Sequence, residues 1–213
     1  MDNSSTNAII NVASALGGTV VGATLAWVRE AWTARGTRTR NATYLAIRVV
    51  CLLDQYVSDC AAVVADDGTI MGQEDPNGEL DPQVPLPEAP QYAMDLDWRS
   101  IDANLAYRLL SLANDIRIAN DSIDGTAEMA YGPDQYLLFE AREEQYSELG
   151  LKAHQLTKEL RTTYKLPSPR TPEVWEWNPV ERLTKAKEDV TQRKATHAKT
   201  MASATPFPQQ APG

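Results

Sequence analysis

Residues 98–123 read WRSIDANLAYRLLSLANDIRIANDSI, and this stretch decides the fold class. Its apolar residues recur at steps of three or four positions, and they are Trp98, Ile101, Leu105, Leu109, Leu112, Ile116, Ala119 and Ile123. This spacing places them along one side of an α-helix, while charged and amide side chains occupy the other side. Such a stripe is typical of a helix that packs against other helices. We expect this helix over 95–123, capped by Asp95 or Asp97.

Two further segments, 42–65 and 133–165, show the same periodicity. The apolar face of the first consists of Leu45, Val49, Leu52, Leu53, Tyr56, Val57, Cys60, Val63 and Val64. That of the second consists of Phe139, Tyr146, Leu149, Ala153, Leu156, Leu160 and Tyr164, and Pro133 suits its first turn. Long helices that follow one another pack antiparallel. The sequence therefore predicts an all-α fold in which 42–165 forms an antiparallel bundle of three long helices.

The chain after this bundle divides into three parts. Residues 166–178 form a linker rich in proline and tryptophan, in which Trp175 and Trp177 are candidate contacts for a partner. The alternative is that both rings pack on the protein's own bundle. Residues 179–200 are expected to form a basic C-terminal helix, started by a capping residue at Asn178, and it is either a solvated extension or an interaction arm. Residues 201–213 lack the apolar content to fold.

A short tail, residues 1–6, precedes AIINVASALGGTVVGATLAWV, the 21 residues from Ala8 to Val28 that carry no charge. As a helix this stretch would extend about 30 Å, the thickness of the hydrocarbon core. We therefore predict an N-terminal transmembrane helix over 7–28, although its polar and glycine residues make insertion only marginally favourable. The alternatives are a cleaved signal peptide, which would want basic residues before it, and a helix buried in the core of a soluble protein.

Small residues recur every four positions within this stretch, at Ser14, Gly18, Gly22 and Ala26. They lie on one face of the helix, where small side chains allow two helix backbones to approach closely, and Gly18 to Gly22 is a GxxxG motif. This pattern predicts self-association within the membrane, so a second copy of the chain is one expected partner.

Residues 29–41 form a basic juxtamembrane connector, expected to be broken or weakened near Gly36. Arginines lie after the uncharged stretch, whereas Asp2 is the only charged residue before it. Because basic residues stay on the cytoplasmic side, we expect a single-pass protein with its N-terminus outside and its C-terminal domain in the cytoplasm. The arginines either only fix this orientation or also contact anionic head groups of membrane lipid.

Nine acidic residues and no basic residue lie between Asp66 and Asp97, while the rest of the chain holds 20 of each sign. The net charge of −9 thus comes from one segment, and it argues against a nucleic-acid-binding protein. Five prolines in 66–93 disfavour both helix and strand. We expect a long, solvated acidic loop there, and a candidate site for a protein partner.

No linear motif nominates a catalytic, cofactor-binding or metal site. Cys51 and Cys60 are expected on opposite faces of one helix, both as small buried residues, and so cannot bind one metal. Neither His154 nor His197 has the preceding Glu that a di-iron bundle needs. The leading hypothesis is a membrane-anchored helical interaction or scaffold protein. A helical enzyme or toxin-like effector without a linear motif, and a soluble helical protein, remain as alternatives.

Overall fold

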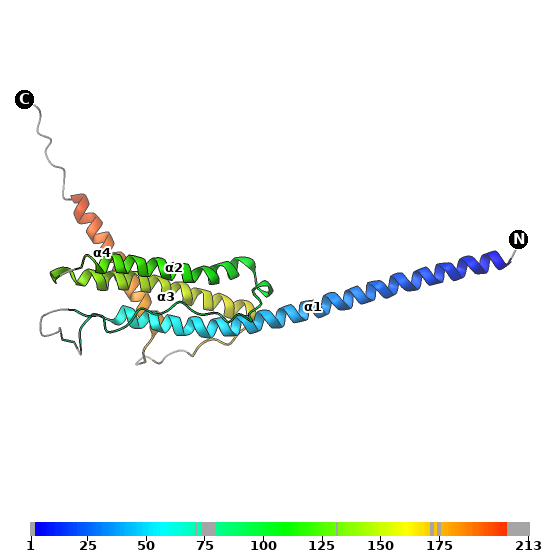
Figure 1. Ribbon diagram of the computed structural model, residues 1–213, viewed down its shortest axis with the longest axis horizontal. Coiled ribbons are helices and arrows are strands. Elements are labelled where there is room, and N and C mark those ends of the chain that lie inside the picture. Colours follow the sequence, from blue (N-terminus) through cyan, green and yellow to red (C-terminus); the bar gives the residue numbers. More distant parts are fainter. Residues whose placement is uncertain are drawn as a thin grey trace, which may run out of the picture.

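The structure is a computed structural model, and it is all-helical over the residues that it describes (Figure 1). The backbone is described for residues 3–70, 72, 73, 80–130, 132–170, 173 and 176–203, and the side chains of 3–28, 31, 133, 202 and 203 are outside the description. The elements are α1 (Asn3–Ala65), η1 (Trp98–Ser100), α2 (Ala103–Ala127), η2 (Gly132–Asp134), α3 (Tyr136–Tyr164) and α4 (Pro179–Ser203). The predicted helical bundle is confirmed at this level.

Helix α1 is 63 residues long and has two parts. Its C-terminal part, from about Ala42, packs in the bundle, and its N-terminal part continues away from the bundle (Figure 1). The break expected near Gly36 is absent. A single glycine costs a helix only about 1 kcal/mol, which the neighbouring turns offset. The hydroxyls of Thr33 and Thr37 also bond back to the carbonyl oxygens of Arg29 and Thr33, at 2.8 and 3.0 Å.

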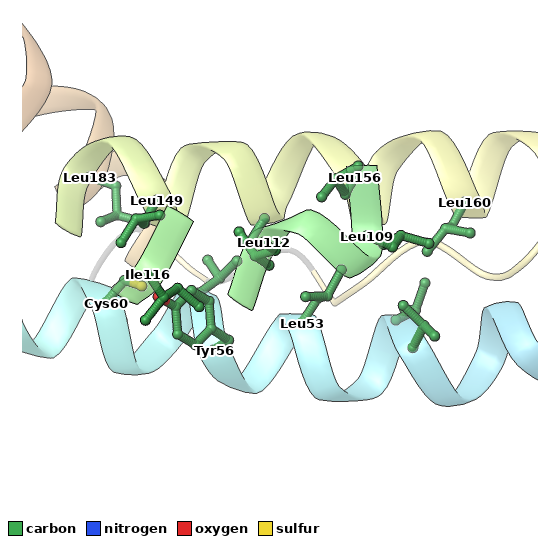
Figure 2. Packing of buried hydrophobic residues seen from close by; sticks show 14 of the residues in the cluster. Leu53, Tyr56, Cys60, Leu109, Leu112, Ile116, Leu149, Leu156, Leu160 and Leu183 are labelled. Carbon is green, nitrogen blue, oxygen red and sulfur yellow. The ribbon is translucent and has the colours of Figure 1, made fainter. Parts of the chain in front are cut away.

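The core lies where α1, α2 and α3 meet. Figure 2 shows Leu53 and Tyr56 of α1 facing side chains of α2 and α3, with Leu183 of α4 joining at one end. The stripe predicted for 98–123 is confirmed, because Leu105, Leu109, Leu112, Ile116, Ala119 and Ile123 are all buried on α2.

The start of α2 differs from the prediction. Asp102 caps the helix, and its Oδ1 accepts hydrogen bonds from the backbone N–H groups of Asn104 and Leu105 at 2.9 and 3.1 Å. Asp97 instead caps the short η1, where it accepts from the N–H of Arg99 at 3.2 Å. Both aspartates accept hydrogen bonds from backbone N–H groups at the start of a helix, as capping residues do. Two helices, η1 and α2, therefore begin where the sequence predicted one.

The segment 80–97 packs between α1 and α2, and the expectation of a solvated loop is wrong for this part. Val84, Leu86, Ala89, Tyr92 and Ala93 lie partly buried against the core. The hydroxyl of Tyr92 donates to the carbonyl oxygen of Leu109 on α2 at 3.2 Å, and Arg48 of α1 pairs with Asp95 at 3.2 Å. Proline prevents a regular ladder or helix, but it does not prevent extended chain from burying apolar side chains.

Helix α4 docks on the bundle through its first half. Leu183 is fully buried, and Ala186 and Val190 are nearly so. The Asn178 cap is confirmed, because its Oδ1 accepts from the N–H of Glu181 at 3.3 Å. The end of α4 extends past the bundle (Figure 1). Helix α4 is therefore docked on the bundle over its first half, and neither a solvated extension nor an interaction arm describes this half.

Within the part of the chain searched for membrane spans, no helix is both long and apolar enough to cross a bilayer. The predicted transmembrane helix rests on the side chains of 7–28, which lie outside the description. Their backbone forms the N-terminal part of α1.

Candidate functional site

The surface of α1 is exposed where the helix leaves the bundle. Every described side chain from Arg29 to Arg40 is exposed, and Trp32 is 73% exposed. At 100° per residue, Arg29 and Arg40 point to one side of the helix, and Arg35 and Arg38 point to the other side. Positive charge therefore lies on more than one side of the helix along this stretch.

The element η1 brings a fifth arginine to this region from a distant part of the sequence. Arg38 Nε donates to the carbonyl oxygen of Ser100 at 3.3 Å, which holds η1 beside α1. The side chain of the neighbouring Arg99 is 99% exposed. Arg38 and Arg99 line an open depression of about 510 Å³. We call the set Arg29, Arg35, Arg38, Arg40 and Arg99 the arginine collar. No linear signal reveals Arg99, because its place depends on the contact between η1 and α1.

Among the described residues, Asp97, Asp102 and Glu30 are acidic neighbours of the collar in the sequence, and the first two accept hydrogen bonds from backbone N–H groups. Asp97 caps η1 and also accepts from Asn41 Nδ2 at 3.3 Å, and it lies 3.8 Å from the Arg99 guanidinium. Asp102, which caps α2, is the second. Glu30 is the third, and it is exposed. The collar thus keeps an excess of positive charge.

A row of exposed side chains continues along α1 inside the bundle. Tyr44 is 51% exposed, Ile47 is 46% exposed and Cys51 is also exposed. We call these three residues the α1 outer stripe. Ile47 and Cys51 follow Gly18 and Gly22 by 29 residues each, about eight turns at 3.6 residues per turn. The stripe therefore lies on the same side of α1 as the predicted self-association residues.

The two cysteines lie on opposite sides of α1, as expected, but only Cys60 is buried. Burial raises the pKa of the Cys60 thiol to about 12, so it is held as the unreactive neutral form. The expectation of burial is wrong for Cys51. Cys51 lies opposite Cys60, and so opposite the apolar face of α1 that the neighbouring helices cover.

The predicted site residues fall in different places. The side chains of Ser14, Gly18, Gly22 and Ala26 lie outside the description, as does Trp175. Trp177 is 55% exposed, so it is not docked in the core of the bundle. It lines an open depression of about 480 Å³ with Asn178, Arg182 and Lys185.

A buried ion pair fixes the start of the 80–97 segment. Arg142 Nη2 donates to Asp66 Oδ2 at 2.9 Å, and the two side chains are 5% and 2% exposed. Burial lowers the pKa of the Arg142 guanidinium, and the Asp66 carboxylate opposes this effect. The same Asp66 oxygen accepts from the N–H groups of Gln83 and Val84 at 3.0 and 2.9 Å. The pair therefore joins α3, the end of α1 and the 80–97 segment.

A second buried polar contact lies deeper in the core. The hydroxyl of Tyr146 donates to Asn120 Oδ1 at 2.7 Å, and burial raises the pKa of Tyr146 to about 12. Neither this contact nor the Asp66–Arg142 pair lines either of the depressions described above. Among the described residues, no three His, Cys, Asp or Glu side chains are grouped to hold a metal ion.

Comparisons with protein-family models, with curated proteins and with solved structures each found no match to this chain. The arrangement of the described residues is thus the basis for assigning a function.

Proposed function

We propose that this chain is a membrane-anchored helical scaffold, whose bundle is held at the cytoplasmic face by the N-terminal part of α1. One observation carries the proposal. The uncharged residues 8–28, the collar arginines other than Arg99 and the first helix of the bundle all belong to one unbroken helix, Asn3–Ala65. A helix of this kind transmits the position of its membrane segment directly to the bundle.

Two features of the described residues support this placement. Trp32 is 73% exposed one turn after the uncharged stretch, where amphipathic aromatic rings favour the boundary between lipid and water. The arginines that follow it are exposed, as residues facing head groups and cytoplasm would be. The path of α1 away from the bundle also disfavours a soluble protein with this helix in its core (Figure 1).

We further propose that two copies associate through α1. Close approach would begin at Gly18 and Gly22 within the membrane. The α1 outer stripe lies about eight turns later on the same side of the helix, so it lies on the side where a parallel partner chain would be. Exposed aromatic and aliphatic side chains such as Tyr44 and Ile47 are suited to that contact.

The site for a different protein partner is proposed at Trp177. An exposed tryptophan beside an open depression is a typical anchor point for a protein contact. The 80–93 segment is a weaker candidate than its sequence indicated, because much of its apolar surface is already packed on the core. Deleting this segment would damage the bundle and would not test partner binding.

Membrane extraction tests the anchor. The full chain should stay in the membrane pellet after carbonate treatment. The variant Val20→Arg/Val21→Arg should move to the supernatant, because each arginine at a helix centre costs insertion about 2.5–3.5 kcal/mol. A matched control, Thr191→Arg/Thr196→Arg, adds the same charge on exposed positions of α4 and should stay in the pellet. Recovery of the unaltered chain in the supernatant as a folded monomer would overturn the proposal.

A further inference from the structure

The arginine collar has more positive charge than its surroundings neutralise. No ion pair joins Arg29, Arg35 or Arg40 to any acidic side chain of the described residues, and the pair between Arg99 and Asp97 is long at 3.8 Å. Arg99 belongs to η1, far along the sequence, and lies beside the arginines of α1. The excess of positive charge is therefore not confined to the residues next to the uncharged stretch. Fixing the orientation of a membrane helix does not require η1 to add an exposed arginine.

We propose that the arginine collar binds the head groups of anionic phospholipids. This inference rests on the proposed membrane anchor. Arg29 follows the uncharged stretch directly, so the lipid head groups are the anionic groups that this end of the bundle meets first. Because Arg29 and Arg35 point in different directions around α1, the collar can contact lipids on more than one side of the helix.

The helical rise divides the collar into two levels. Arg35 lies about 9 Å and Arg40 about 17 Å beyond Arg29 along the axis, at 1.5 Å per residue. The field of a charged bilayer decays over about 8 Å at physiological ionic strength and about 30 Å at 0.01 M salt. With α1 upright, Arg29 and Arg35 therefore carry most of the attraction at high salt. Arg40 and Arg99 contribute mainly at low salt.

Trp32 lies between the two arginines of the first level and is 73% exposed. Its ring is suited to the region of the head groups and would hold this level at a fixed depth. The open depression lined by Arg38 and Arg99 extends along α1 from Glu30 to Asn41. It also contains Glu30 and Asp97, so it is a poorer anion site than the exposed side chains of Arg29 and Arg35.

Spin-labelled lipids test the collar in the full chain. The protein is reconstituted in vesicles of phosphatidylcholine with a minor fraction of phosphatidylserine, and the motionally restricted fraction of each labelled lipid gives their relative affinities. We expect phosphatidylserine to be preferred about fivefold for each arginine at the surface. The variant Arg29→Gln/Arg35→Gln/Arg40→Gln/Arg99→Gln should show a preference near one. Arg38 is kept, because it holds η1.

A control variant removes the same charge elsewhere, with Gln in place of the exposed Arg117, Lys152, Lys158 and Lys199. It should keep the wild-type preference. The proposal that the collar binds anionic lipid is overturned by either of two results. One is a wild-type preference for phosphatidylserine near one, and the other is a preference that the collar variant retains. Binding of an oligonucleotide in neutral detergent, lost in the collar variant, would assign the arginines to nucleic acid and also overturn it. Carbonate extraction of the same samples tests the membrane anchor separately. A failure of the anchor proposal is therefore distinguishable from a failure of the proposal that the collar binds lipid.

Discussion

Arg142 of α3 and Asp66, one residue after α1, form an ion pair at 2.9 Å that is almost completely buried. The Asp66 carboxylate is surrounded by donors, because it also accepts from the backbone N–H groups of Gly68, Gln83 and Val84. Arg142 further donates to the carbonyl oxygen of Val84 at 2.5 Å. The pair thus holds the 80–97 segment in its place between α1 and α2.

Replacing Asp66 by Ala should therefore destabilise the protein strongly. It leaves the Arg142 charge buried without a partner, for which about 3–5 kcal/mol is typical. Urea unfolding measures this loss, and hydrogen exchange should show the largest gain at Gln83 and Val84. The exposed pair Arg117–Asp121 is the control, and Asp121→Ala should cost less than about 1 kcal/mol. Equal losses for Asp66→Ala and Asp121→Ala would contradict the structural role of the buried pair.

Gly150 allows α1, α3 and α4 to meet closely. A Cβ atom at this position would lie 2.7 Å from Leu183 Cδ1 and 2.9 Å from Cys60 Cβ. We expect Gly150→Ala to lower the free energy of unfolding by about 1–3 kcal/mol through overpacking, despite the better helix propensity of alanine. Gly125→Ala in α2 is the matched control, since nothing lies within 4 Å of its Cβ. It should stabilise the protein by up to about 1 kcal/mol, and a similar gain for Gly150→Ala would refute the close contact.

The docking of α4 depends more on Leu183 than on its ion pairs. Leu183 is fully buried, whereas Lys194, which pairs with Glu144 at 2.6 Å, has a side chain that is 63% exposed. Leu183→Ala should cost about 2–5 kcal/mol and Lys194→Gln less than about 1 kcal/mol. Hydrogen exchange along α4 and urea unfolding measure both. A larger effect from Lys194→Gln would mean that charge, and not burial, holds the helix.

Alkaline pH should destabilise the bundle between pH 10 and 12. Burial raises the pKa of Tyr92 and Tyr146 from 10.0 to about 12, so the unfolded chain loses these protons first as pH rises. The contribution of both tyrosines to the free energy of unfolding is fully present below pH 10. It decreases toward pH 12 by roughly 1.4 kcal/mol per tyrosine for each pH unit. Urea unfolding at pH 9, 10, 11 and 12 measures the slope. The slope should be shallower in Tyr92→Phe, and an unchanged slope in this variant would count against the shifted pKa.

The periodicity of single segments predicted much of this fold. The stripe from Leu105 to Ile123 needed only the 3.6-residue repeat, and it is buried as expected. The packing of the 80–97 segment could not be predicted in this way, because extended chain with prolines has no helical repeat and its burial depends on a gap between two helices. The same limit applies to Arg142, which local patterns place among surface charges until Asp66 is brought to it by the fold.

The candidate site was predicted less completely than the fold. The arginines of α1 follow from their position after an uncharged stretch, but Arg99 joins them only through the contact of η1 with Arg38. The exposure of Cys51 was missed for a different reason. Cys51 lies opposite Cys60 on the helix and so opposite its apolar face, but its residue type alone suggested burial.

Cys51 offers a direct test of self-association. It is exposed on the α1 outer stripe, 29 residues or about eight turns after Gly22, so two parallel copies joined at the glycines should bring their Cys51 thiols to the same side. In membranes, a long, flexible bis-maleimide should therefore crosslink the chain into a dimer, because helices that cross at a GxxxG motif diverge beyond it. Cys60 should not react before unfolding, because it is buried and its thiol has a pKa of about 12.

The glycines should control this crosslink. Gly18→Ile/Gly22→Ile removes the close approach of the backbones and should reduce the dimer band, while leaving carbonate-resistant membrane association intact. The variant Cys51→Ser/Asp121→Cys moves the cysteine to an exposed position of α2. It controls for random collisions and should give little dimer. Equal crosslinking from both cysteine positions, or a dimer unaffected by the isoleucines, would show that the copies do not associate through this side of α1.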